Sequence, residues 1–171
     1  GLVGSEMCIR DSLVAVQEIK DIDQTVPYDF LDAINAKSTS PWDMLLSPRS
    51  GLQEDDQSSQ EQYAFYYNTS VFSAIGNGTL HNDSADDSFQ REPFIGQFEV
   101  LDNNGTGTGF DLSLITVHTK PGEETIDEIN ALPHVVNTYL ENNQNESEVV
   151  ILGDFNAECS YVSSNELSNS P

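Results

Sequence analysis

The sequence has 171 residues, with 29 Asp and Glu against 6 Lys and Arg, for a net charge of −23. That length fits one domain, and the 37% of hydrophobic residues is enough for a core. No apolar run approaches the roughly 20 residues that a membrane span needs. A scaffold that holds nucleic acid by a positive net charge is excluded, so a protein of this composition that handles phosphates needs divalent cations to screen the repulsion.

Residues 1–12 are expected to be foreign to the domain. The segment Leu2–Ser12 reads LVGSEMCIRDS, which matches the translation of a transposon-based sequencing-library adapter. If this segment is excluded, Cys8 is excluded with it, and Cys159 is the one cysteine left in the sequence. We expect residues 13–171 to be a partial domain, truncated at both ends, so that the lack of a signal peptide says nothing about secretion.

The first half of the domain is predicted to alternate short strands with polar loops. A helix is favoured where a proline in the first turn precedes Phe30, Leu31 and Ile34 on one face. The expected elements are a strand at Leu13–Val16, a helix at Pro27–Ala36, a loop at Ser47–Gln60, strands at Tyr63–Tyr67 and Val71–Ile75, and a polar loop at Gly76–Gln90.

The second half is predicted to hold a hairpin, a long helix and a buried strand. The helix has apolar residues at a spacing of three and four, and Pro133 is expected to kink it. The expected elements are strands at Pro93–Leu101 and Phe110–Val117, a helix at Glu123–Asn143 and a strand at Val149–Leu152. Strands with intervening helices predict an α/β or α+β sheet domain.

Polar side chains follow three of these predicted strands. Glu18 comes just after the first, His118 after the fifth, and Asp154 and Asn156 after the last. These groups are predicted to converge on one rim of a sheet, where ligand sites of α/β proteins lie. Taken singly, each has a plainer interpretation: a solvated strand end, a core histidine with its hydrogen bonds satisfied, or a turn residue.

Five sequence blocks together cover nearly all of residues 13–162. They are VAVQEIKD (Val14–Asp21), QEQYAFYYN (Gln60–Asn68), DSFQREPF (Asp87–Phe94), SLITVHTKP (Ser113–Pro121) and VVILGDFNAECSYV (Val149–Val162). These blocks resemble the DNase I family, within the endonuclease/exonuclease/phosphatase superfamily, and fall in the order of that family. GDFN marks the superfamily, whereas DSF before REP and the full GDFNAECSYV are more specific. The resemblance implies a four-layered β-sandwich flanked by helices, and metal-dependent hydrolysis of DNA.

The resemblance also implies roles for the clustered polar residues. Glu18 matches the glutamate that ligates the catalytic Mg²⁺ or Mn²⁺, and His118 matches a histidine that protonates the leaving oxygen. Glu61 matches the glutamate that orients this histidine, which requires the strand after Glu61 to neighbour the strand that ends at His118. Asp154 and Asn156 match the pair at the scissile phosphate.

Substrate contacts carry over less completely. Arg91 matches an arginine that contacts DNA, and Tyr161 matches a tyrosine that contacts phosphate. Lys20 stands where the family usually has arginine, so a point charge replaces a bidentate fork. Ser59 falls where the family has an aromatic residue, which puts the family's groove preference in doubt.

Asp87, Phe89 through its carbonyl, and Glu92 lie where the resemblance implies a structural calcium ion. The alternative is a solvated acidic loop. Cys159 matches a half-cystine whose partner lies beyond Pro171, and its alternative is a small buried thiol.

The family's second catalytic histidine, in an Asp-His pair, has no counterpart in the sequence. His81 lies in a polar loop and His134 in the long helix, so neither is expected to replace it. We therefore expect the 171-residue chain alone to be inactive. Secretion is suggested by five N-x-[ST] sequons, at Asn68, Asn77, Asn82, Asn104 and Asn145.

The favoured hypothesis is a fragment of a secreted, divalent-cation-dependent endodeoxyribonuclease. It is expected to be monomeric, with DNA as its substrate, no membrane association and no obligate protein partner. The alternatives are a phosphodiesterase of the same superfamily acting on a lipid or sugar phosphate, a non-catalytic DNase-like binding module, and an acidic surface glycoprotein.

Overall fold

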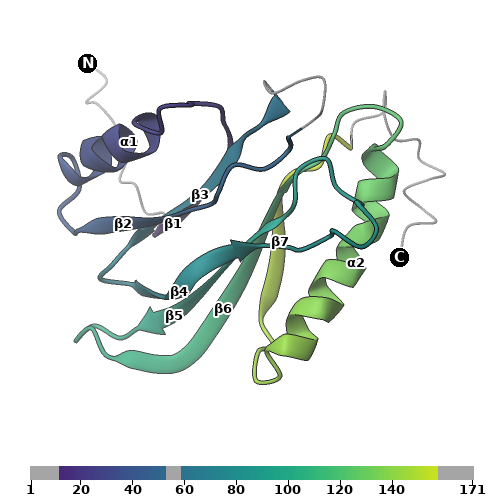
Figure 1. Cartoon of the computed structure of the whole chain (residues 1–171). Coiled ribbons are helices and arrows are strands. Elements are labelled where there is room, and N and C mark those ends of the chain that lie inside the picture. Colours follow the sequence, from purple (N-terminus) through teal and green to yellow (C-terminus); the bar gives the residue numbers. More distant parts are fainter. Residues whose placement is uncertain (1–11, 53–58, 158–171) are drawn as a thin grey trace, which may run out of the picture.

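Two β-sheets pack face to face, and a helix covers the outer face of each (Figure 1). The structure is a computed structural model that describes residues 12–52 and 59–157. The first sheet has the order β1-β3-β2, with β1 at Leu13–Ile19, β2 at Trp42–Leu46 and β3 at Gln62–Asn68. The second has the order β4-β5-β6-β7, with β4 at Phe72–Leu80, β5 at Phe94–Leu101, β6 at Gly107–His118 and β7 at Val149–Asp154. The helices are α1 at Val26–Asn35 and α2 at Thr125–Asn142.

Aromatic side chains fill the space between the two sheets. Phe65 of β3 stacks on Phe94 of β5 with 5.5 Å between ring centroids, and meets Phe98 edge-on at 5.8 Å. All three side chains are fully buried. Because successive residues of a strand face opposite sides of the sheet, the YAFYY segment sends Phe65 inward, between the sheets, and Tyr66 outward, under α1.

Each helix buries one apolar stripe on the outer face of its sheet. Leu31 and Ile34 of α1 pack against a cluster that includes Tyr66, whereas Leu132 and Val135 of α2 pack on the second sheet. The order helix, sheet, sheet, helix confirms the four-layered sandwich and the mixed α/β class. Within the described ranges, neither helix is long and apolar enough to cross a membrane.

Two strands differ most from the sequence prediction. Strand β2, Trp42–Leu46, was not predicted: its buried residues are Trp42 and Leu45, three positions apart, so it lacks the strict alternation of a half-buried strand. Strand β4 continues to Leu80, five residues past the predicted end, because Thr79 and Leu80 pair with β5 after an irregularity in register. Glycine and asparagine are uncommon in strands, so the sequence pattern did not indicate that the strand continues through this stretch, which forms one edge of the second sheet.

The long helix α2 connects the parallel strands β6 and β7 and continues through Pro133. The register of these two strands places His118 directly opposite Asp154. One residue earlier Val117 faces Gly153, whose φ is +140°, and a Cβ there would lie 2.0 Å from the carbonyl oxygen of Val117. Glycine therefore permits the close approach that sets Asp154 beside His118.

Candidate active site

Three side chains gather where the two sheets meet at one end of the sandwich. One ligand atom each from Glu18, His118 and Asp154 lies within 4.8 Å of the others. His118 and Asp154 end neighbouring strands of the second sheet, but Glu18 belongs to β1 in the first sheet. The predicted convergence is present, but on a rim shared by two sheets rather than on the rim of one.

Glu18 owes its position to an irregularity inside β1. The strand continues to Ile19 rather than ending at Val16, and its pairing with β3 shifts between these two residues. Glu18 adopts a φ of +59°, in the left-handed region. The preceding Gln17 reaches across to the second sheet, where its Nε2 donates to the Thr116 hydroxyl at 2.8 Å. This contact ties β1 to β6 one step away from the candidate site.

His118 is held by a buried carboxylate and a buried phenol. Its Nδ1 lies 2.7 Å from Glu61 Oε2, and its backbone N–H donates to the Tyr63 hydroxyl at 3.2 Å. A carboxylate only accepts, so Nδ1 carries the proton and Nε2 faces Glu18 Oε1 at 3.7 Å. Glu61 immediately precedes β3, and Tyr63 is the second residue of that strand. Strand β3 neighbours β6, as the role of Glu61 required, by facing it across the sandwich from the other sheet.

Glu61 is fully buried and faces positive side chains. Its Oε1 lies 3.2 Å from Arg91 Nη2 and 3.3 Å from Lys20 Nζ. Burial alone would raise the pKa of the Glu61 carboxyl, but the hydrogen bond to His118 and the charge of Arg91 hold this pKa below its ordinary value. Burial also raises the pKa of the Tyr63 hydroxyl, which keeps it protonated. Glu61 is thus an anion shared by three groups.

Arg91 and Lys20, the sequence-predicted substrate contacts, differ in exposure. The Arg91 side chain is 8% exposed, and its Nε donates to the Ser59 carbonyl at 3.2 Å. The Lys20 side chain is 54% exposed. Both side chains contact Glu61, so they lie beside the Glu61–His118 pair. Because Lys20 is the more exposed of the two, it is the one accessible to a ligand.

The turn after β7 is fastened to the end of β6. Asn156 has a φ of +45°, and its backbone N–H donates to Asp154 Oδ1 at 2.9 Å. Its Nδ2 donates to the Thr119 carbonyl at 2.8 Å. These bonds fix Asp154 and Asn156 next to the residue that follows His118.

The predicted calcium-binding residues lie in the loop before β5. Asp87 has a φ of +49°, Phe89 is buried, and Glu92 has one buried carboxylate oxygen that has no hydrogen-bond partner among the described residues. The Phe89 N–H donates to Asp83 Oδ2 at 3.0 Å. A buried carboxylate oxygen without a donor fits a hard cation as its missing partner.

The other two histidines, His81 and His134, lie together and outside the cluster of Glu18, His118 and Asp154. The rings of His81 and His134 meet edge-on with 6.0 Å between centroids, where the loop before β5 contacts α2. Neither replaces the family's second catalytic histidine in the candidate site. Tyr161, Cys159 and the adapter-like segment apart from Ser12 lie outside the described residues.

Solved structures with this fold define a class of protein. The chain matches the human Nocturnin catalytic domain with bound sulfate at a TM-score of 0.57 and 12% identity, over 88% of this chain and 53% of that one. It matches D. rerio TDP2 complexed with a single-strand DNA product at a TM-score of 0.55 and 15% identity, over 93% of this chain and 51% of that one. The chain therefore shares its fold with these two proteins, which are members of the endonuclease/exonuclease/phosphatase superfamily.

Curated relatives with similar sequences are members of the DNase I family. Deoxyribonuclease-1 of Gallus gallus is 28% identical over 92% of this chain and 54% of its own length. Human deoxyribonuclease gamma is 31% identical over 90% of this chain and 48% of its own length. No family model matches the chain. The resemblance to the DNase I family is confirmed, and the chain spans about half the length of the curated relatives it matches.

Proposed function

We propose that this chain carries part of the active site of a divalent-cation-dependent endodeoxyribonuclease. One observation carries the proposal: Glu18, His118 and Asp154 come from two sheets, yet their ligand atoms lie within 4.8 Å of one another. An imidazole backed by a buried carboxylate, with two further exposed carboxylates beside it, is suited to acid–base and metal-assisted cleavage of a phosphodiester.

The carboxylates fit a divalent cation. Hard cations such as Mg²⁺ and Mn²⁺ take oxygen ligands, and Glu18 and Asp154 are exposed carboxylates on either side of His118. These two residues would hold the ion, which when bound neutralises charge that gathers on phosphate oxygens. Without it, a chain with a net charge of −23 would repel DNA.

The chain's own proton donor would be His118. In its cationic form it carries protons on both nitrogens: Nδ1–H donates to Glu61, and Nε2–H faces the exposed carboxylates, where a leaving oxygen would collect its proton. Glu61 stabilises that cation and fixes the plane of the ring. Asn156 adds an amide beside the phosphate position without adding negative charge.

DNA is the proposed substrate because curated relatives with similar sequences are named deoxyribonucleases. The test is incubation of the complete gene product with supercoiled plasmid and Mg²⁺. We expect nicking that EDTA and the His118→Ala substitution abolish. Release of phosphocholine from a phospholipid, with no nicking, would favour the lipid phosphodiesterase, and binding of DNA without either reaction would favour a binding module.

We further propose that the 171-residue chain alone does not cleave DNA. Of its three histidines only His118 lies in the candidate site, so no second imidazole serves as the base for the attacking water. Mg²⁺-dependent nicking by this chain that His118→Ala abolishes would contradict this part of the proposal.

A structural calcium ion at Asp87, Phe89 and Glu92 is proposed from the unpartnered buried oxygen of Glu92. Calcium binding there should raise the melting temperature of the chain, by the mass action of a ligand that binds only the folded state. The substitution Glu92→Gln should remove the increase. An equal increase in this variant would place the ion elsewhere.

Secretion is proposed from the sequons, whose asparagines at 77, 82, 104 and 145 are exposed and at 68 half-buried. Expression through the secretory pathway of a eukaryotic cell should yield chains that shift in mass on treatment with an N-glycosidase. Chains with no such shift in mass would remove this support for secretion.

We also propose that the protein is a monomer. Measurement of its molar mass in solution tests this proposal.

A further inference from the structure

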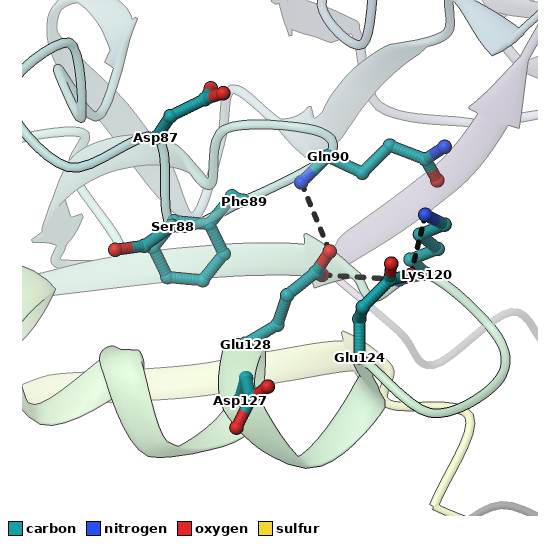
Figure 2. Close-up of a pocket in the computed structure, with 8 residues that line it drawn as sticks. All are labelled: Asp87, Ser88, Phe89, Gln90, Lys120, Glu124, Asp127 and Glu128. Carbon is teal, nitrogen blue, oxygen red and sulfur yellow. Dashed lines mark hydrogen bonds and ion pairs between the residues drawn. The ribbon is translucent and has the colours of Figure 1, made fainter.

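The buried side chain of Glu128, on α2, binds two backbone segments at once. Its Oε1 accepts the N–H of Gln90 at 3.0 Å, and its Oε2 accepts the N–H of Lys120 at 3.1 Å (Figure 2). Glu128 is 3% exposed. Gln90 immediately precedes Arg91, and Lys120 lies two residues after His118.

The same two segments are joined a second time at Glu61. Arg91 Nη2 lies 3.2 Å from Glu61 Oε1, and His118 Nδ1 lies 2.7 Å from Glu61 Oε2. The Arg91 segment and the His118 segment are therefore held at two places, by their side chains on Glu61 and by their backbones on Glu128. If the attachment to Glu128 were lost, each segment would be held only at Glu61 and could rotate about that contact.

We propose that Glu128 is a positioning residue that sets His118 and Arg91 against Glu61. This inference rests on the proposed function, because it treats His118 as the group that acts on the phosphodiester. A carboxylate suits the task because both of its oxygens accept, whereas a glutamine would turn an NH₂ group toward one of the two N–H donors. Hydrogen bonds to a buried charge are also stronger than neutral ones.

The neighbouring carboxylate of Glu124 provides a matched control. Glu124 and Glu128 both line a cavity of about 360 Å³. Glu124 precedes Glu128 by about one helical turn. Its side chain is 57% exposed and pairs with the Lys120 ammonium group on the surface. Exposed pairs of this kind contribute little to folding, so Glu124→Gln changes the charge of the cavity without releasing either backbone segment.

The test compares Glu128→Gln with Glu124→Gln by NMR of the 171-residue chain. In Glu128→Gln we expect the amide protons of Gln90 and Lys120 to exchange about tenfold faster, as loss of hydrogen bonds to a charged group implies. We also expect the downfield Nδ1 proton of His118 to be lost, while the ring signals of His134 on the same helix stay in place. Glu124→Gln should change none of these signals.

A lower melting temperature with an unchanged His118 Nδ1 signal would overturn the proposal, since it would show a purely structural role. If Glu128→Gln does not fold, exchange in the unsubstituted chain decides: Gln90 and Lys120 amides that exchange as fast as in an unstructured peptide would also overturn it. None of these measurements uses metal or DNA, so failure to bind Mg²⁺ or to cleave DNA contradicts the proposed function and not the role of Glu128.

Discussion

Glu61 is the residue on which most of the candidate site depends. It is fully buried, and it is in contact with His118, Arg91 and Lys20. Removing one partner of a buried ion pair leaves an uncompensated charge, whereas an exposed pair is worth little. Because Arg91 is buried and Lys20 is exposed, the two cations on one carboxylate oxygen allow these two cases to be compared.

We expect Arg91→Met to lower the free energy of unfolding by about 3 kcal/mol, as for a broken buried pair. Lys20→Met should lower it by no more than about 1 kcal/mol, because its half-exposed ammonium group is hydrated. Both substitutions keep an unbranched side chain of similar length, and urea unfolding measures both. Equal losses for the two variants would show that burial does not decide the strength of these pairs.

The pKa of Glu61 predicts a dependence of stability on pH. A carboxyl whose pKa is lower in the folded than in the unfolded chain stabilises the fold above its ordinary pKa, 4.5, and this contribution is lost as the pH falls below that value. Between pH 5.5 and pH 3.5 we therefore expect the unsubstituted chain to lose more free energy of unfolding than Glu61→Gln. Parallel losses in urea titrations at each pH would contradict the lowered pKa.

Single residues of the site were predictable to different degrees. Glu18, His118 and Asp154 stand next to predicted strands, so the strand pattern alone indicated them. Glu61 came only from the family resemblance, because a polar residue before a strand has no distinguishing pattern. Glu128 had no signal, since its partners are backbone N–H groups of segments 38 and 8 residues away.

At the scale of elements, the parallel pairing of β6 and β7 brings His118 and Asp154 of the candidate site together. This pairing runs from Ser113 opposite Val149 to His118 opposite Asp154. Gly153 permits the last step, because its φ of +140° leaves the space where a Cβ would meet the Val117 carbonyl oxygen. The glycine of GDFN is therefore a requirement of strand packing as well as part of a motif that resembles the superfamily's.

We expect Gly153→Ala to lower the free energy of unfolding by more than about 2 kcal/mol, since it combines an unfavourable φ with a backbone overlap. Gly105→Ala is the control: its φ is +76°, but no atom of residues 12–52 or 59–157 lies within 4 Å of the added Cβ, so a loss of about 1 kcal/mol is expected. Differential scanning calorimetry compares the two. A smaller effect at Gly153 than at Gly105 would contradict the close approach of β6 and β7.

Strand prediction succeeded where apolar residues form a continuous run and failed where the edge strand of a sheet contains polar residues or glycine. The YAFYY strand is buried on both faces and was found, as was the VVIL strand. Strand β2 is short and carries Asp43, and β4 contains Gly76 and Gly78 at positive φ, so neither had a full strand pattern. Which strands share a sheet was not predictable, because it depends on contacts between distant segments.

At the scale of the molecule, the negative charge opposes folding. The net charge is −23, so like charges repel across the surface, and dissolved salt screens them. We expect the melting temperature to rise as NaCl increases from about 10 mM to about 300 mM, a range in which the screening length falls from about 30 Å to below 8 Å. A melting temperature that falls over this range would show that attractive pairs dominate the electrostatics.

We have proposed that Glu18 and Asp154 bind a divalent cation beside the Glu61–His118 pair. Paramagnetic broadening of NMR signals by Mn²⁺ tests it most directly, because it reports which residues lie near the ion. We expect substoichiometric Mn²⁺ to broaden the signals of Glu18 and Asp154, and of the neighbouring His118, first, and Glu18→Gln to abolish the effect. Broadening confined to the acidic cavity around Asp87 and Asp127, with His118 unaffected, would contradict the assignment of the site.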